Sequence, residues 1–261
     1  MKLYRVNALM LKYWYICMNR IDRWFDIFYW PLLDIVLWGF MTTYIKNISE
    51  FNLLSALLGG IILWMFVWRG GQDISLFVLE DFWSRNIYNT FTTPVKEVEI
   101  VISTIIFGFF RSLMSFVAMA LLAFVMHGFN ILTLPWGILA AIVPILMLFG
   151  WATGIFIAGL IFRFGQRVQI FAWSFVWILQ PFSCVFYPLA SLPFWAQPIA
   201  KALPTTHVFE ALRAGLNGTP VQWGWIAYAV IATLTAHVVL TMFLASSLKS
   251  AKKKGLLTRY D

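Results

Sequence analysis

Long apolar runs separated by short polar segments dominate the sequence. Each run is close to or above the ~20 residues that a helix needs to cross the hydrocarbon of a bilayer. This pattern predicts an all-α membrane protein with six transmembrane helices, and it excludes a soluble core because the runs are too long for core elements. The six runs cover about residues 24–45, 53–70, 101–127, 136–162, 168–187 and 223–247.

A shorter and more polar segment, residues 3–22, precedes the first run. Its apolar residues recur at helical spacing, its basic residues gather on another side, and only Leu9 and Ile16 fall on the polar side. The pattern favours an amphipathic helix that lies in the membrane interface. The alternative is a polar-flanked extension of the first span. The apolar set is Leu3, Val6, Met10, Tyr13, Cys17 and Ile21.

Composition supports the assignment to a membrane. Hydrophobic residues make up 61% of the chain and charged residues only 11%, and the mean hydropathy is +0.81. The formal charge of +8 does not indicate nucleic acid, because the basic residues lie at the ends of apolar runs and in the tail, residues 248–261. With both termini in the cytoplasm, only Lys46, Lys201 and Arg213 are basic residues on the outer side, as the positive-inside rule requires.

The sequence contains no catalytic constellation. His127, His207 and His237 fall on different segments, and neither metal-ligand spacing nor a phosphate-binding loop occurs. The two cysteines, Cys17 and Cys184, are placed on opposite membrane faces by this topology, which predicts neither a disulfide nor a cysteine metal site. We therefore expect no enzyme activity and no metal, and an energy source in an ion gradient or another polypeptide.

The longest predicted cytoplasmic connection covers residues 80–100. Asp81 and Arg85 are four apart and can pair along a helix that continues out of the membrane. Thr93 precedes Pro94, which ends the helix and opens the next one, with Glu97 in its first turn. Two interpretations remain open: a solvated loop with ordinary capping, and a short helix that docks a partner.

Ionisable residues inside predicted spans are costly and are therefore functional candidates. Asp34 lies ten residues into the first span, about 15 Å deep at 1.5 Å per residue. Arg111, in the third span, is its natural partner by charge. Asp34 fits either an internal ion pair or helix contact, or a contact with substrate. Asp26 and Arg23, nearer the interface, are expected to extend their polar ends toward water.

Two further polar residues lie in predicted spans. Gln180 stands beside Pro181, and His237 lies in the last span. Hydrogen bonding between helices is the expected role of both side chains.

The order of these elements resembles the type-2 ATP-binding-cassette exporter permeases. The likeness rests on an interfacial N-terminal helix, six spans, the loop "EDFWSRNIYNTFTTPVKEVEIV" and the proline-bounded "LPFWAQPIAKALPTTHVFEALRAGLNG" before the last span. The resemblance implies a homodimer in the bacterial or archaeal inner membrane, surrounded by lipid, with two copies of a cytoplasmic ATPase subunit that binds ATP and Mg. It also implies that the second-to-third loop docks the ATPase, through Asp81, Arg85, Asn86, Tyr88, Asn89, Thr93, Pro94 and Glu97.

The same resemblance implies a role for residues 188–222. Five of the ten prolines fall here and would break the chain into short half-helices that re-enter the outer leaflet. Glu210 and Arg213, three apart, would neutralise each other there. A helix lying flat on the outer surface is the alternative. The prolines are Pro188, Pro193, Pro198, Pro204 and Pro220.

These observations predict a permease subunit of an ATP-driven exporter. Its substrate would be an amphipathic drug or lipid, or a lipid-linked glycan. The translocation path would contain the intramembrane polar residues Asp34, Arg111, Gln180 and His237. The alternative is a channel or ion-gradient-driven carrier that uses Asp34 and His237, although no internal repeat typical of many carriers is found.

Overall fold

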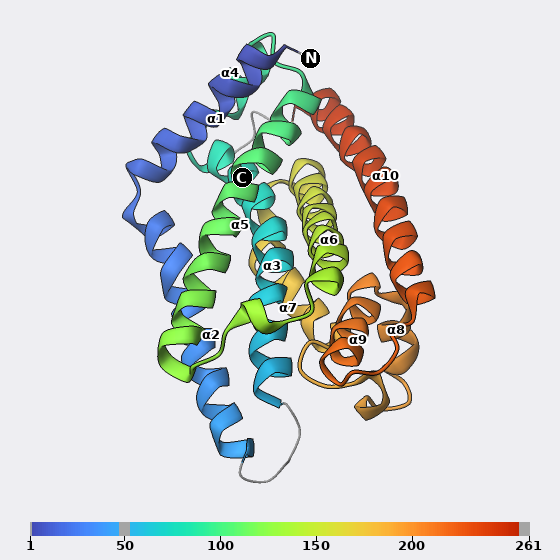
Figure 1. The fold of residues 1–261 in the computed structure, drawn as a ribbon. Helices are drawn as coiled ribbons and strands as arrows, with labels where there is room; N and C mark the ends of the chain where they lie inside the picture. The colour runs from blue at the N-terminus through green and yellow to red at the C-terminus, as the bar shows by residue number, and fades with distance from the viewer. Residues whose placement is uncertain (1, 47–52, 256–261) are drawn as a thin grey trace.

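The computed structural model describes residues 2–46 and 53–255, and within those ranges every element is an α-helix or a 3-10 helix (Figure 1). Five long helices form the bundle: α2 (Ile21–Lys46), α3 (Leu53–Trp83), α5 (Glu97–His127), α6 (Trp136–Phe164) and α10 (Trp223–Lys254). The shorter α-helices are α1 (Leu3–Met18), α4 (Ile87–Thr92), α7 (Ile170–Leu179), α8 (Gln197–Ala202) and α9 (Pro204–Leu216). The 3-10 helices are η1 (Ile131–Thr133), η2 (Gly165–Val168), η3 (Gln180–Ser183) and η4 (Leu189–Ser191).

The five long helices are long and apolar enough to cross a membrane. They correspond to five of the six predicted spans. The remaining predicted span, residues 168–187, is a shorter apolar stretch in which η3 follows α7. Pro181 lies in the first turn of η3, and Cys184 ends it in the left-handed region with φ 53°. The count of six spans therefore stays a prediction.

Helix α3 lies at the centre of the bundle. In the most apolar stretch of α3, every residue is buried in the protein. In the most apolar stretch of α10, only 17% of the residues are buried. Helix α6 crosses α3 where glycines bring the two backbones together: a Cβ on Gly154 would lie 2.9 Å from the carbonyl oxygens of Gly70 and Gly71. Small residues four apart, Gly150 and Gly154, permit this approach between membrane helices.

Helix α3 is longer than the predicted span of residues 53–70, because it continues to Trp83. The sequence favoured a helix that continues out of the membrane through Asp81. The helix continues because neighbouring helices supply partners for its charges, Asp73 and Glu80.

Helix α1 packs one face against α3 and α5, with Val6, Leu9, Tyr13 and Cys17 buried. Leu9 was expected on the polar side and instead faces the protein, because the buried face follows the spacing 6, 9, 13, 17. Other large apolar side chains of α1 are exposed, including Leu3, Tyr4 and Tyr15.

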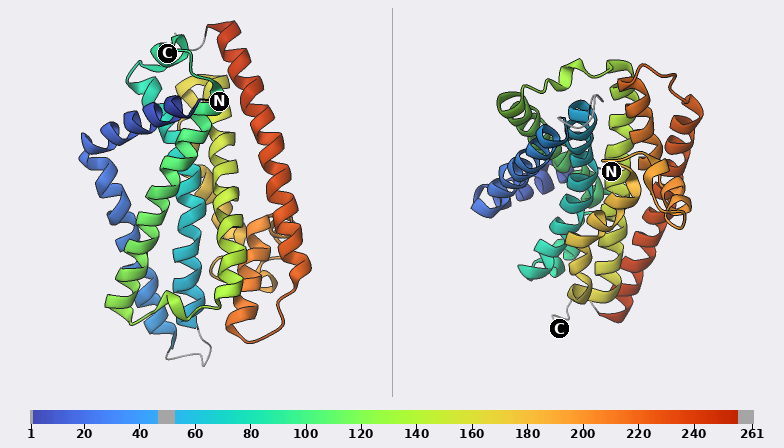
Figure 2. Two further views of the ribbon diagram at one scale, coloured as in Figure 1. Left: turned by 45° about the horizontal axis from the view of Figure 1, so that its top comes forward. Right: turned by 90° about the horizontal axis from the view of Figure 1, so that it is seen from below.

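The two ends of the bundle carry different elements. Helices α1 and α4 and the last turns of α10 lie at one end (Figures 1 and 2). Helices α8 and α9 and the connection between α5 and α6 lie at the other end. The N-terminal segment and the proline-rich segment are therefore at opposite ends, as the predicted topology requires.

Candidate functional site

Helix α4 is a single short helix held between the ends of α3 and α5. The turn before it places Arg85 in the left-handed region with φ 56°, and the Asn86 N–H donates to the Asp81 carbonyl at 2.9 Å. Ile87 and Thr90 are buried, whereas Asn89 is exposed. Helix α4 therefore presents one side to the protein and another to the surroundings.

Asp81 and Arg85 do not lie on one continuous helix, because α3 ends at Trp83. Asp81 accepts from Lys12 Nζ of α1 at 2.5 Å and from Thr90 Oγ1 of α4 at 3.3 Å. One carboxylate thus joins α1, α3 and α4. Lys12 could not be identified as its partner from the sequence, because the two residues are far apart along the chain.

A second contact fastens the beginning of α1 to the beginning of α5. Glu99 accepts from the Lys96 N–H at 2.9 Å, which caps α5, and from the Lys2 N–H at 2.8 Å. Arg5 Nη1 donates to the Pro94 carbonyl and lies 3.6 Å from Glu99. The segment that contains α4 connects α3 to α5, and α1 is bonded to both of these helices, through Asp81 of α3 and Glu99 of α5.

Among the predicted docking residues, Asp81 and Pro94 contact α1. The others belong to α4 or to the residues on either side of it. Asn89 Nδ2 lies 3.2 Å from Asn86 Oδ1, and Thr93 Oγ1 donates to the Thr90 carbonyl at 2.7 Å. The side chains of Tyr88 and Glu97 lie outside the described part of the structure.

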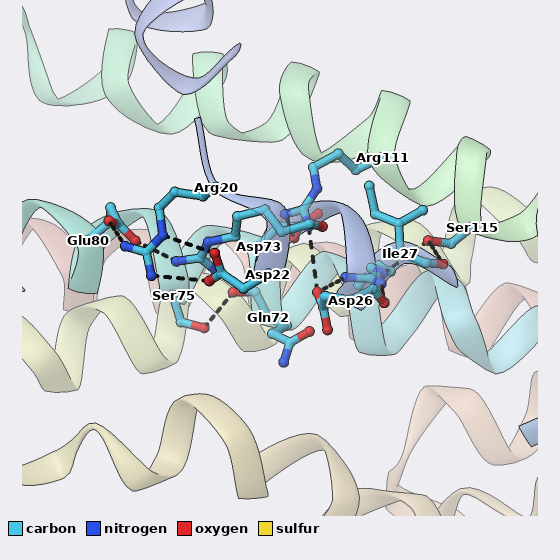
Figure 3. A network of polar contacts seen from close by, with 12 residues as sticks. Arg20, Asp22, Asp26, Ile27, Gln72, Asp73, Ser75, Glu80, Arg111 and Ser115 are labelled. Carbon is cyan, nitrogen blue, oxygen red and sulfur yellow. Dashed lines mark hydrogen bonds and ion pairs between the residues drawn. The ribbon is translucent and has the colours of Figure 1, made fainter. Parts of the chain in front are cut away.

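Deeper in the bundle, a network of charged side chains connects α2, α3 and α5 (Figure 3). Arg69 is fully buried, and its guanidinium donates to Asp26 Oδ2 at 2.5 Å and to Ser115 Oγ at 3.1 Å. Arg111 pairs with Asp73 and lies 3.6 Å from Asp26. Glu80 accepts from Arg23 at 2.5 Å and from Arg20 at 2.8 Å.

These contacts correct two expectations from the sequence. Arg111 does not pair with Asp34, because Asp73 of α3 and Asp26 of α2 lie beside it. Arg23 does not extend to water, since it is 8% exposed and bound to Glu80, and the Asp26 carboxylate is bound to Arg69. In the low dielectric of a bundle, buried charges are retained when they are paired and hydrogen-bonded.

Asp73 and Glu80 of α3 were not predicted as site residues, although the sequence contains a signal. Arg69, Asp73 and Glu80 are spaced by four and seven residues. This spacing places them on one face of a helix. A charged stripe on an otherwise apolar helix indicates that other helices supply counter-charges.

Asp34 lies at the deep end of an aromatic groove between α2, α3 and α7. A cavity of about 380 Å³ is lined by Gln72, Ser174 and four tryptophans, Trp30, Trp68, Trp173 and Trp177. The Trp68 ring stands edge-on to Trp30 and to Trp177, with centroids 6.5 Å apart in each pair. A narrow continuation of about 10 Å³ is lined by several of these rings together with Asp34 and Gln180.

His237 has the helix-to-helix contact expected of it. Its Nε2 lies 2.6 Å from the Leu148 carbonyl oxygen of α6. Asp34 and His237 belong to α2 and α10, which lie on opposite sides of the bundle (Figure 1). The structure therefore does not bring together the two residues proposed for a carrier.

At the other end, prolines begin short helices as predicted. Pro188 precedes η4 and Pro204 starts α9, while the Pro193 carbonyl accepts from the Ala196 N–H at 2.9 Å. The expected pair forms, since Arg213 Nη2 donates to Glu210 Oε1 at 2.8 Å. The same oxygen accepts from the Leu189 N–H at 2.7 Å, which joins α9 to η4.

A cavity of about 660 Å³ lies next to this pair. Its wall includes Glu210, Arg213, Asn217, Gln222 and Trp225. The entry of this end of the bundle into a membrane leaflet stays a prediction.

Cys17 and Cys184 are both free and buried. Burial is the main cause of a raised pKa at the Cys17 thiol. Among the described residues, no group of histidine, cysteine, aspartate and glutamate side chains is arranged to hold a metal ion.

The model of the family described as ABC-2 type transporter matches residues 8–217, which is well over half of the chain. The chain belongs to this family. Members are transmembrane permeases that generally work with a cytoplasmic ATPase subunit and do not themselves hydrolyse ATP. This permease is therefore an integral membrane protein of a transport system, and the match extends from α1 to the end of α9. A search of curated proteins finds no match.

Proposed function

We propose that this permease is the transmembrane subunit of an ATP-driven exporter and acts as a homodimer with two copies of a separate ATPase, which binds ATP and Mg. The observation that carries the proposal is the position of α4. It is a short helix at one end of the bundle, contacted by α1 and bonded to α3. A helix in this position transmits a push from a soluble partner to several long helices at once.

The docking surface would be the exposed side of α4 and of the turns beside it. Arg85, Asn89, Thr92 and Pro94 are exposed there, whereas Ile87 and Thr90 anchor the helix on its inner side. Exposed polar residues on an anchored helix suit a rigid contact, because little ordering is needed on binding.

The aromatic groove between α2, α3 and α7 is our candidate for the translocation path. Tryptophan faces with nearby carboxylate and amide groups suit a substrate that has both apolar and hydroxyl-bearing surfaces. This favours a lipid-linked glycan or another amphipathic lipid or drug. Gln72, Asp34 and Gln180 supply the polar groups along the groove.

The proposed orientation places α1, α4 and the tail in the cytoplasm of a bacterial or archaeal cell, with the permease in the inner membrane. Lysines at the end of α10, at positions 252, 253 and 254, support this orientation. Helices α8 and α9 would then lie at the outer face, where the cavity beside Glu210 and Arg213 marks an exit.

Site-specific photo-cross-linking in cells tests the proposal. A benzoylphenylalanine at Asn89 should form an adduct with an ATPase subunit, identified by mass spectrometry. The same probe at Trp195, which is 66% exposed at the opposite end, is the matched control and should form none. Adducts with an ATPase from both positions, or from Trp195 alone, would reject the docking role of α4.

A further inference from the structure

The aromatic groove between α2, α3 and α7 has two compartments of very different size. The wider one has a volume of about 380 Å³ and is lined by the four tryptophans named above, with Gln72 and Ser174. The narrower one, of about 10 Å³, is lined by three of the same rings together with Asp34 and Gln180. The wide compartment is within the range of about 300–1,000 Å³ typical of ligand cavities. The narrow one admits a group about the size of one water molecule.

The tryptophans of this groove are not placed as membrane anchors. Tryptophan is enriched at the two membrane interfaces, but Trp68 is the central residue of α3 and is 8% exposed. The other three rings, Trp30, Trp173 and Trp177, are 42–49% exposed, so the cavity is open on one side. Rings gathered around a cavity in the middle of a long helix are typical of a binding site.

Two polar side chains in the wall have no hydrogen-bond partner among the described residues. Gln72 is 3% exposed, and its Oε1 is buried and unpaired. Its amide points away from Arg111, and no dashed line reaches it in Figure 3. Because Oε1 is enclosed, the amide nitrogen is the atom that meets the cavity, and a half-turn about the terminal bond exchanges the two. Asp34 likewise has neither a hydrogen bond nor an ion pair with the described part of the chain.

The charges around the groove disfavour an ionic occupant. The Arg69 guanidinium carbon lies 5.0 Å from the centroid of the Trp68 ring, so this ring already faces a positive charge. Within the described residues no carboxylate lines the wide compartment, and the narrow one, where Asp34 lies, is too small for a trimethylammonium group. An anion is disfavoured because the faces of aromatic rings carry negative charge density. These observations favour a neutral molecule.

A sugar ring matches both compartments. Its C–H groups can pack on the negative faces of the indole rings. A hydroxyl both donates and accepts, so it pairs with the Gln72 amide in either orientation. One hydroxyl is also small enough for the narrow compartment, where it donates to the Asp34 carboxylate. A hydrocarbon would leave both polar groups unpaired, which is costly in a buried site.

We propose that this groove selects a neutral hexose ring over cationic and wholly apolar molecules, and that Gln72 and Asp34 determine this choice. The inference rests on the proposed export function and narrows its substrate to an amphipathic glycolipid whose sugar enters the groove. The ring occupies the wide compartment, and one of its hydroxyls reaches Asp34.

Equilibrium binding to the purified full chain in nanodiscs tests this choice. The probe is radiolabelled octyl β-glucoside below its critical micelle concentration. One competitor is the same glucoside with every hydroxyl methylated, which keeps the ring but has no O–H to donate. The other is octyltrimethylammonium, which keeps the alkyl chain but carries a cation. Octyl glucoside should bind about tenfold more tightly than either competitor, and equal or tighter binding of either one would overturn the proposal.

Variants of the wall locate the binding site. Asp34→Leu should weaken binding of octyl glucoside by about tenfold and leave binding of the methylated glucoside within about twofold, because only the former donates to a carboxylate. Gln72→Leu and Trp177→Leu should weaken octyl glucoside binding by about fivefold or more. The control is Trp223→Leu, at a position on α10 that is 62% exposed and remote from the groove. Equal losses in Trp177→Leu and Trp223→Leu, or no loss in Asp34→Leu, would overturn the proposal.

Thermal unfolding of each variant shows that a loss of binding does not reflect a loss of the fold, and the half-exposed Trp177 keeps the test available if a buried variant unfolds. The cross-link from Asn89 separates this inference from the proposed function. An ATPase adduct without octyl glucoside binding would overturn the sugar site and leave the docking role of α4. Binding that depends on Asp34 without an adduct would support the sugar site and reject the docking role.

Discussion

Neutralising Asp26 should destabilise the permease strongly. The Asp26 carboxylate lies 2.5 Å from Arg69 and 3.6 Å from Arg111, and Arg69 is 0% exposed. The variant Asp26→Asn keeps the size of the side chain but leaves the Arg69 charge with only neutral partners. Removing one member of a buried ion pair typically costs about 3–5 kcal/mol, because the remaining charge stays buried without compensation.

Asp22→Asn is the matched control. Asp22 is on the same helix and also pairs with an arginine, Arg20, at 3.1 Å, but its side chain is 58% exposed. Exposed pairs contribute about 0–1 kcal/mol. The two variants therefore make the same chemical change at a buried and an exposed site.

The assay is thermal unfolding in one detergent at one scan rate, because membrane proteins often unfold irreversibly and their Tm then depends on the rate. At about 2–4 °C per kcal/mol, Asp26→Asn should lower Tm by roughly 6–20 °C and Asp22→Asn by no more than about 4 °C. The double variant Asp26→Asn/Arg69→Met should recover part of the loss, since it removes both charges. Equal Tm values for the two single variants would refute the assignment of a buried, energetically important network.

Two other predictions concern packing and thiol reactivity. Gly154→Ala should destabilise the protein by about 1–3 kcal/mol, because its Cβ meets α3 backbone at 2.9 Å. Gly137 is on the same helix and has open space around it, so Gly137→Ala should not destabilise the protein. Similar losses of Tm in the two variants would contradict a tight crossing at Gly154. At pH 8, a maleimide should modify Cys184 in the folded protein far more slowly than after denaturation, because this thiol is 0% exposed and burial blocks access to it. Modification at comparable rates before and after denaturation would show that this thiol is accessible.

The sequence allowed much of the fold to be predicted, because apolar length and proline chemistry act locally. The long helices and the short helices that begin at Pro188 and Pro204 needed no knowledge of tertiary contacts. The burial of charged residues on α3 could not be predicted in this way. Asp73 and Glu80 are tolerated in a buried helix only because Arg111 and Arg23 reach them from other helices.

The candidate site was predicted less completely for the same reason. The loop around α4 was identified from Pro94 and its charged neighbours, but Lys12, the partner of Asp81, comes from α1. Asp34 was chosen as an unusual residue within a predicted span, yet charge alone assigned it the wrong partner. Its tryptophan neighbours come from α2, α3 and α7, which only the folded chain brings together.

The glycine crossing of α3 and α6 affects how the bundle can deform. Backbone lies directly against backbone at Gly150 and Gly154, so a small rotation about that point displaces few atoms. The ion pairs, in contrast, fasten α1, α2, α3 and α5 to one another. We expect these four helices to tilt as one body against α6, with Gly150 and Gly154 acting as the pivot.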